Sequence, residues 1–296
     1  MLHVTVGLKR QKIGCLYLHI MEIIMTTEDI ATVTESNREA WDISAKHHQE
    51  SEEWSKICIS VREADFNCFD KAMTAALNKM NLSGKNVVQI GCNNGREILS
   101  LDSFGAGKCL GIDQSQQFIN QANELNDIAK KSSEFICANI YNLPNDVPRG
   151  FDMALITIGV LSWMPDLSKF FKTIAELLNE NGQLIIYETH PFLEQFEPNS
   201  ETPFTLEHSY FRTEPIIEDT VITYDGSKHD GGVKSYWYIH TLSKIFTKIM
   251  DAKFQVTCFE EYAHSNREVD YSIYENAPTQ IPMCYILKAK LSKDNG

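Results

Sequence analysis

The sequence contains no pair of cysteines at the two-residue spacing that zinc sites and redox motifs use. A reduced thiol within an apolar run behaves as a small hydrophobic side chain. The eight cysteines are scattered, several of them in such runs, at Cys15, Cys58, Cys68, Cys92, Cys109, Cys137, Cys258 and Cys284. The sequence therefore predicts no metal site and no disulfide framework, and it favours a reducing, cytoplasmic compartment.

Clusters of lysine and arginine are also missing. The chain has 40 acidic residues against 27 basic ones, which gives a formal net charge of −13 at pH 7. A surface of this charge repels phosphate backbones, so the composition argues against a nucleic-acid partner. No apolar run reaches the length of a bilayer-spanning helix, so we expect no membrane partner. The oligomeric state has no signature in the sequence.

Residues 1–24 differ from the rest of the chain. Three basic residues precede an apolar run at 13–25, as in a signal peptide, but His19 and Glu22 interrupt the run and no small-residue cleavage site follows. Met25 opens a polar stretch that resembles a natural start. The segment is either an upstream extension outside the native protein or an amphipathic arm that packs on the domain.

Short apolar strands alternate with amphipathic helices from residue 86 onward. Before them, the capping box of Ser36 and Glu39 predicts a helix that begins at Ser36, and the spacing of apolar residues predicts another over 65–80. The pattern then predicts strands at 86–91, 108–113, 134–138, 151–158 and 183–187, and helices at 97–104, 114–131 and 166–180, with Asn181 and Gly182 ending the last helix. Such alternation indicates βαβ units, hence a doubly wound α/β fold with helices on both faces of a parallel sheet.

The segment at about 190–240 breaks this rhythm. It is rich in aromatic residues, glutamate and proline, and we expect an insertion or lid. A helix at 241–251 and strands near 254–260 and 283–291 follow. The predicted organisation is an extension at 1–24, a helical segment at 25–80 and an α/β domain at 81–296.

Two features mark the edge of the sheet where ligands bind in such folds. The turn after the first strand runs from Gly91 to Gly95 and opens onto a helix, so its backbone can approach a ligand closely. Asp113 ends the second strand, where a carboxylate can accept hydrogen bonds from both hydroxyls of a ribose. A glycine turn alone is usually just a tight turn, and an aspartate after a strand is usually a helix cap. Together, at this spacing, they favour a nucleoside cofactor.

The motifs distinguish between nucleoside cofactors. A dinucleotide fingerprint requires a third glycine where Arg96 and Glu97 stand. Instead, five segments resemble, in order, the motifs of class I S-adenosylmethionine-dependent methyltransferases: VVQIGCNNGRE at 87–97, GID at 111–113, CAN with LP at 137–144, FD at 151–152 and LNENG at 178–182. The resemblance covers about residues 36–290. It implies a Rossmann-like, mostly parallel seven-stranded sheet with an antiparallel last strand, methyltransferase activity, and S-adenosyl-L-methionine as cofactor.

The resemblance also implies roles for individual residues. Asn93 stands where the family usually has glycine, and Gln89 where it usually has an acid. Asparagine tolerates positive φ, so the loop can keep its shape. For Ile140 and Ile158, plain core packing is an equal interpretation. By position, the cofactor residues are Gly91, Asn93 and Gly95 around the methionine moiety, Asp113 at the ribose, Gln114, Asn139 and Ile140 at the adenine, and Ile158 closing the pocket.

Candidates for the acceptor side follow the fourth and fifth strands. Methyl transfer is an in-line displacement that requires a base only when the acceptor arrives protonated. Glu188 and His190 follow the fifth strand and are the catalytic candidates, although a lone histidine is often a structural hydrogen-bonder. Packing roles are the alternative for the substrate-binding candidates, which are Trp163, Trp237, Tyr238 and His240.

The favoured hypothesis is a methyltransferase with a small-molecule methyl acceptor. One alternative is a protein that binds S-adenosylmethionine or S-adenosylhomocysteine without transfer activity, which the residues at Gln89 and Asn93 suggest. Another is a protein methyltransferase. Residues 157–160 lack the Asn-Pro-Pro-Tyr type of motif, which argues against methylation of a nucleic-acid base.

Overall fold

The computed structural model describes residues 26–223, 229–266 and 270–292. Residues 1–24, with both interpretations of them, lie outside the described residues. The helices are α1 (Thr27–Gln49), α2 (Glu52–Ser60), α3 (Lys71–Met80), α4 (Arg96–Ser100), α5 (Gln116–Ala129), α6 (Leu167–Leu177) and α7 (Leu242–Asp251). The strands are β1 (Val87–Ile90), β2 (Cys109–Asp113), β3 (Glu134–Cys137), β4 (Phe151–Thr157), β5 (Leu178–Thr189), β6 (Ile216–Glu218), β7 (Ser235–Trp237), β8 (Phe254–Tyr262) and β9 (Cys284–Leu291). Short 3₁₀ turns are η1 (Leu101–Phe104), η2 (Ile140–Asn142), η3 (Leu161–Trp163), η4 (Leu193–Gln195) and η5 (Asp270–Tyr274).

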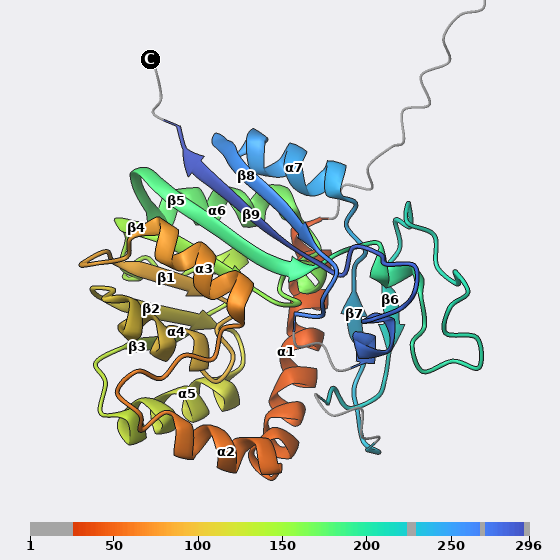
Figure 1. Ribbon diagram of the computed structural model, residues 1–296, viewed down its shortest axis with the longest axis horizontal. Coiled ribbons are helices and arrows are strands. Elements are labelled where there is room, and N and C mark those ends of the chain that lie inside the picture. Colours follow the sequence, from red (N-terminus) through yellow and green to blue (C-terminus); the bar gives the residue numbers. More distant parts are fainter. Residues whose placement is uncertain (1–25, 224–228, 267–269, 293–296) are drawn as a thin grey trace, which may run out of the picture.

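Seven strands form one sheet in the order β3-β2-β1-β4-β5-β9-β8 (Figure 1). The strands from β3 to β5 are mutually parallel, whereas β9 runs antiparallel to both of its neighbours, β5 and β8. The predicted doubly wound α/β fold, with a mostly parallel sheet and an antiparallel last strand, is confirmed. Ile90 pairs with Ile112 of β2 and with Ile156 of β4, so the carboxyl ends of these three strands lie level.

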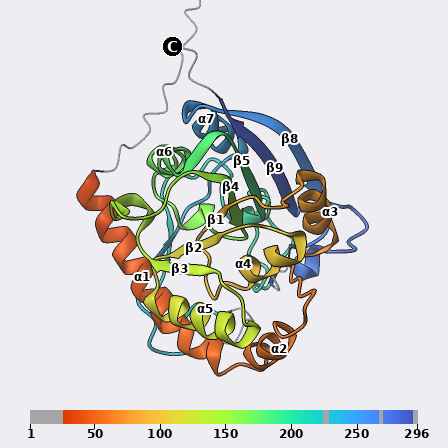
Figure 2. The same ribbon diagram turned by 90° about the vertical axis from the view of Figure 1, so that its left-hand side faces the viewer.

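Helices cover both faces of the sheet because successive strand residues point to opposite sides. Val88 and Ile90 of β1 pack in the cluster that contains α6 and α7, whereas Val87 packs in the cluster that contains α3 and α4. Figure 2 shows α6 and α7 on one side of the sheet and α3 and α4 on the other. The cluster under α6 contains Phe170, Phe171, Ile174 and Leu177, the apolar stripe that the sequence predicts.

The first helix begins nine residues earlier than predicted. Thr26 and Asp29 form the capping box: the Thr26 hydroxyl accepts from the Asp29 amide at 3.1 Å, and the Asp29 carboxylate accepts from the Thr26 amide at 2.9 Å. Ser36 lies in the middle of α1 and its hydroxyl donates to the Lys234 carbonyl oxygen at 2.5 Å. The prediction from Ser36 and Glu39 was wrong. Thr26 with Asp29 and Ser36 with Glu39 both have the spacing of a capping box, and the first pair forms it.

Other boundaries also differ from the prediction. The helix predicted over 65–80 begins only at Lys71, because Asp70 caps it by accepting from the Met73 amide at 2.8 Å. The preceding helix α2, capped by Ser51, was not predicted. Helix α6 ends at Leu177 and not at Asn181, since Leu178 already pairs with Phe151 of β4.

Helix α1 lies across the carboxyl ends of the strands, between the sheet and the insertion (Figure 1). Asn37 binds the backbone of Tyr236 twice: its side-chain amide donates to the carbonyl at 3.1 Å, and its side-chain oxygen accepts from the amide at 2.7 Å. The Ser44 hydroxyl donates to the Ile222 carbonyl at 2.6 Å. The amino-terminal helix and the insertion therefore form one continuous cover over the strand ends. No helix within the part of the chain that the structure describes is long and apolar enough to cross a membrane.

Candidate active site

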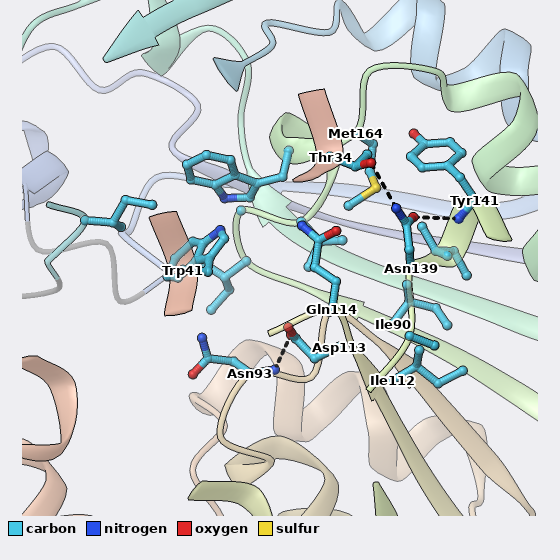
Figure 3. A pocket seen from close by; sticks show the side chains of 18 of the residues that line it. Thr34, Trp41, Ile90, Asn93, Ile112, Asp113, Gln114, Asn139, Tyr141 and Met164 are labelled. Atoms are coloured by element: carbon cyan, nitrogen blue, oxygen red, sulfur yellow. Dashed lines mark hydrogen bonds between the residues drawn. The ribbon is translucent and has the colours of Figure 1, made fainter. Parts of the chain in front are cut away.

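A cavity opens at the carboxyl ends of β1, β2 and β4, beneath the cover (Figure 3). Thr34 and Trp41 of α1 line it, as do Ile222 and Thr223 of the insertion. The residues predicted from the sequence that also line it are Gly91, Asn93, Asp113, Gln114, Asn139, Ile140, Ile158, Trp163 and Trp237. Elements from four parts of the sequence thus meet in one cavity.

The loop after β1 is shaped by close approach and by positive φ. Gly91 has φ +66°, and a Cβ atom there would lie 2.7 Å from Val160 Cγ2. Asn93 also adopts a left-handed conformation, with φ 51°, as the substitution for glycine requires. The Asn93 amide donates to Asp113 Oδ2 at 2.8 Å. The loop and the end of β2 are therefore fixed to each other at the cavity floor.

Asp113 lies at the end of β2 with both carboxylate oxygens in hydrogen bonds. Oδ2 accepts from the Asn93 amide, and Oδ1 accepts from the Ser115 amide at 2.9 Å. Burial raises the pKa of Asp113, while these backbone donors oppose the rise. An ionised carboxylate has about four acceptor positions, so Asp113 can still accept a hydrogen bond from a ribose hydroxyl.

Asn139 lies at the other end of the cavity floor from Asn93, and Gln114 lies between them (Figure 3). Asn139 caps η2, because its Oδ1 accepts from the Tyr141 amide at 3.0 Å, and its Nδ2 donates to Thr34 Oγ1 at 2.9 Å. One lone pair of Oδ1 stays available for a ligand amine. The Gln114 side chain stands in the middle of the cavity (Figure 3). Ile140 is almost fully buried and serves both the core and the cavity wall.

Gly95 is placed away from the cavity lining. It has φ +76° and begins α4, and a Cβ atom there would lie 2.6 Å from Phe135 Cε1. Close packing against Phe135 explains the glycine. Gln89 also lies outside the cavity, fully buried, and its Nε2 donates to Thr157 Oγ1 at 2.9 Å. This amide links β1 to β4 at the position where the resembling family usually has an acid.

Three tryptophans form one wall of the cavity. The ring centroids of Trp41 and Trp163 are 5.2 Å apart, those of Trp163 and Trp237 are 4.9 Å apart, and both contacts are edge-to-face. The Trp237 indole N–H donates to Glu194 Oε2 at 2.8 Å, which fixes that ring. Trp41 belongs to α1 and is not among the site residues predicted from the sequence. Its place in the wall depends on how α1 crosses the sheet, which has no local signal.

Tyr238 and His240 lie behind this wall and do not line the cavity. The Tyr238 amide donates to the Ser162 carbonyl at 2.7 Å. His240 Nε2 donates to the Met164 carbonyl at 2.8 Å, and burial, helped by Lys244, lowers the pKa of His240 to about 3. Both residues hold η3 in place, so their prediction as substrate-binding residues is corrected to a supporting role.

His190 points toward β8 and β9 and not into the cavity. Its Nδ1 accepts from the Phe192 amide at 3.1 Å, so the proton is on Nε2, which donates to Glu261 Oε1 at 3.0 Å. Burial lowers the pKa of His190, and Glu261 opposes the shift. With both ring nitrogens bound, the geometry gives His190 a structural role, contrary to the expectation that it acts on the acceptor.

Glu188 is buried beneath the turn that follows β4. Its carboxylate accepts from the amides of Gly159 and Leu161, the latter at 3.0 Å. It does not line the cavity, although the turn that it binds does. Glu188 was expected to be near the reaction centre, but the structure places it one layer behind.

These residues fit S-adenosylmethionine. A buried carboxylate at the end of β2 suits a ribose, amide side chains suit the polar edge of adenine, and indole rings suit a sulfonium cation. Residues 26–223, 229–266 and 270–292 contain no group of three or more side chains that could hold a metal ion.

Comparisons with known proteins agree with this geometry. Residues 88–186 match the family model described as a methyltransferase domain. An uncharacterized protein of Haemophilus influenzae is 23% identical over 229 residues, which cover 72% of this chain and 84% of that protein. The tRNA U34 carboxymethyltransferase of Campylobacter hominis is 31% identical over 107 residues, only 36% of this chain and 37% of that enzyme. The match thus spans about a third of that relative.

Solved structures share the fold. A putative S-adenosylmethionine-dependent methyltransferase from Listeria monocytogenes has a TM-score of 0.53 at 19% identity, covering 74% of this chain and 97% of the other. A methyltransferase of the same kind from Mesorhizobium loti has a TM-score of 0.51 at 17% identity, with the same coverage. The matched segment is thus a methyltransferase domain, the chain has the fold of S-adenosylmethionine-dependent methyltransferases, and the cavity fits S-adenosyl-L-methionine as cofactor.

Proposed function

We propose that this protein transfers the methyl group of S-adenosylmethionine to a small-molecule acceptor. One observation carries the proposal: Asp113 and the three tryptophans line the same cavity. The carboxylate fits a nucleoside, and the aromatic wall offers a separate apolar surface for a second molecule. A protein that only binds the cofactor would have no use for that second surface.

We assign the cofactor to the floor of the cavity. Asp113 would accept a hydrogen bond from a ribose hydroxyl, and Gln114 and Asn139 would bind the polar edge of the adenine. The loop at Gly91 and Asn93 would hold the methionine moiety by its backbone. Ile140 would supply an apolar contact to the adenine, and Ile158 would close the pocket.

Alignment of the acceptor is the main task of the chain's own residues. When bound, S-adenosylmethionine supplies a methyl group already activated by a sulfonium sulfur. The protein must place a nucleophile in line with that carbon and exclude water. Trp163 and Trp237 form a rigid wall that does both, because edge-to-face contacts and the bond to Glu194 leave the rings little freedom.

The cover favours a small acceptor over a macromolecule. Thr34 and Trp41 come from α1, and Ile222 and Thr223 come from the insertion, so both parts enclose the cavity. A protein side chain or a nucleotide in a polymer would have to displace this cover. The net charge of −13 further opposes a nucleic acid.

The cavity also favours a methyl group over a carboxymethyl group. A carboxymethyl donor would bring a second carboxylate close to the transferred carbon. The described residues that line the cavity include no lysine, arginine or histidine, and Asp113 is the charged side chain among them. A carboxylate there would be desolvated without a partner. We therefore do not assign carboxymethyl transfer, which the name of the Campylobacter relative states, to this chain. The match between the two proteins covers only 107 residues.

Mass spectrometry can test this function. The protein is incubated with methyl-deuterated S-adenosylmethionine in three separate reactions. The first contains a low-molecular-weight metabolite extract, the second purified tRNA and the third a protein extract. We expect one labelled product in the metabolite fraction. Label in tRNA or protein would overturn the small-molecule acceptor. Tight S-adenosylhomocysteine binding without label in any fraction would favour a binding protein. Asp113→Ala is the matched control and should lower labelling at a limiting cofactor concentration.

A further inference from the structure

The turn after β4 has an unusual backbone. Ile158 has φ 22° and Gly159 has φ 87°, so two consecutive residues are at positive φ. A β-branched residue rarely adopts such a conformation, so other bonds must hold it. Ile158, Gly159 and Val160 all line the cavity. The shape of this turn therefore shapes the site itself.

Two residues of β5 hold the turn from behind. The Ile158 amide donates to the Tyr187 carbonyl at 2.9 Å. The Glu188 carboxylate accepts from the Gly159 and Leu161 amides, one on each oxygen. Glu188 is only 3% exposed. Charge-assisted bonds to two backbone amides in a buried site are among the stronger hydrogen bonds in proteins.

The turn lies next to the aromatic wall. A Cβ atom on Gly159 would lie 3.7 Å from Trp237 Cη2 and 4.0 Å from Trp163 Nε1. Both indoles therefore lie beside the backbone that Glu188 holds, with room for about one methyl group between them and Gly159. Any displacement of Gly159 changes the surroundings of both rings.

We propose that Glu188 is a positioning residue whose carboxylate fixes the turn at 158–161 and, through it, the tryptophan wall that aligns the acceptor. The proposal rests on the proposed function, because alignment matters only if an acceptor binds at that wall. Glu188 itself touches neither the cavity nor its contents. It acts by holding the backbone amides of Gly159 and Leu161 in place.

The geometry requires a carboxylate and not merely a polar side chain. Glutamine has one acceptor oxygen, and its NH₂ group would face the second backbone amide, donor against donor. One buried amide of the turn would lose its partner, which is costly in a buried site. The strained conformation at Ile158 would then relax and displace the indoles.

Nuclear magnetic resonance of the four tryptophan indoles tests this without any acceptor. In Glu188→Gln, we expect the indole N–H signals of Trp163 and Trp237 to shift or broaden. Trp54 packs in a separate cluster with α2 and should not change. The matched control is Glu261→Gln, which also contacts the end of β5, through His190, and whose glutamine oxygen can still accept that bond. Indole signals unchanged in Glu188→Gln would overturn the proposal.

Kinetics then separate positioning from simple stability. With the acceptor in hand, we expect kcat of Glu188→Gln to fall by about a hundredfold, the scale of a 1 Å misplacement. The dissociation constant of S-adenosylhomocysteine should change by less than about threefold, because no cofactor contact is altered. The proposal would be contradicted if activity fell only in proportion to the unfolded fraction, so that the folded variant had the kcat of the wild type. If no acceptor is ever methylated, the proposed function fails while the indole result still stands.

A second variant decides the case if Glu188→Gln does not fold. Gly159→Ala forces the turn away from φ 87° while its Cβ meets only ordinary contacts, so it disturbs the turn without changing Glu188. We expect the same two indole signals to move. Native signals and native kcat in a folded Gly159→Ala would show that the turn does not position the wall, and would overturn the proposal.

Discussion

The hydroxyl of Ser115 donates a hydrogen bond to the carboxylate of Asp42, with 2.6 Å between the two oxygens. Ser115 follows Asp113 at the end of β2 and caps α5, whereas Asp42 belongs to α1. The Gln117 amide also donates to the same Asp42 oxygen, at 3.2 Å. This pair of residues therefore joins the cover of the cavity directly to the strand that carries the ribose-binding candidate.

Asp42→Ala should loosen the cover. Loss of these bonds should reduce the free energy of cofactor binding by about 1 kcal/mol. We therefore expect S-adenosylhomocysteine to bind roughly fivefold more weakly. Hydrogen exchange should become faster along α1, which carries Thr34 and Trp41 of the cavity wall. The control is Glu35→Ala, an exposed partner of Arg38 on the same helix. Equal affinities in the wild type and in Asp42→Ala would show that α1 does not contribute to cofactor binding.

Asp113→Ala should weaken cofactor binding more strongly. Removal of hydrogen bonds to a charged group costs roughly 1.5–3 kcal/mol, which calorimetry with S-adenosylhomocysteine can measure. Asp102→Ala provides a control, because its carboxylate pairs with Lys131 away from the cavity. Unchanged affinity in a folded Asp113→Ala variant would remove this residue from the cofactor site.

Trp237→Ala should act on the acceptor alone. Truncation removes an apolar surface whose burial by the acceptor contributes about 1.5–3 kcal/mol to binding. The Michaelis constant of the acceptor should therefore rise by roughly tenfold or more. Affinity for S-adenosylhomocysteine should stay within about twofold, since the cofactor candidates lie on the floor. Trp237→Phe keeps an aromatic ring and should have the smaller effect. A loss of cofactor affinity equal to that of the acceptor would place Trp237 in the cofactor site.

His240 should make the protein less stable in mild acid. Its pKa in the folded state is about 3, below the ordinary value of 6.5, so the unfolded chain binds the proton more readily as the pH falls below 6.5. Between pH 7 and pH 5, this group alone should remove about 2 kcal/mol from the free energy of unfolding. His240→Gln can still donate to Met164 but does not titrate. Urea unfolding should therefore show a weaker pH dependence in this variant, and an identical dependence would contradict the assignment.

His190→Ala should lower stability without changing the chemistry. The ring makes two buried hydrogen bonds, so we expect a loss of about 1–3 kcal/mol in the free energy of unfolding. Corrected for the folded fraction, kcat and the acid limb of the pH–rate profile should match the wild type. Disappearance of the acid limb would restore His190 as a general base.

Local patterns were enough to predict the sheet and the floor of the cavity. The turn at Gly91 and the strand end at Asp113 follow from short stretches of sequence, and β1 and β2 are neighbours in the structure. The wall could not be predicted in the same way. Trp41 reaches the cavity because α1 is held by distant residues such as Tyr236, and hydrogen bonds over such a separation in sequence cannot be read from the periodicity of the chain.

The acceptor side was mispredicted for a related reason. A position at the end of β5 or just after it predicts nearness to the strand ends, but not which way a side chain points. His190 packs against Tyr285 of β9, and Glu188 lies under the β4 turn, so both face protein and not the cavity. The orientation depends on the twist of the sheet and on β9, which is far away in the sequence.

The position of α1 at the start of the chain has a consequence for biosynthesis. The contacts of Asn37 with Tyr236 join residues 199 positions apart. A ribosome therefore releases α1 long before the segment on which it docks has been made. Contacts between residues so far apart in sequence form late in folding, because closing the long intervening loop costs conformational entropy. Helix α1 is thus translated well before the residues on which it docks, and the cavity can close only after Tyr236 has emerged.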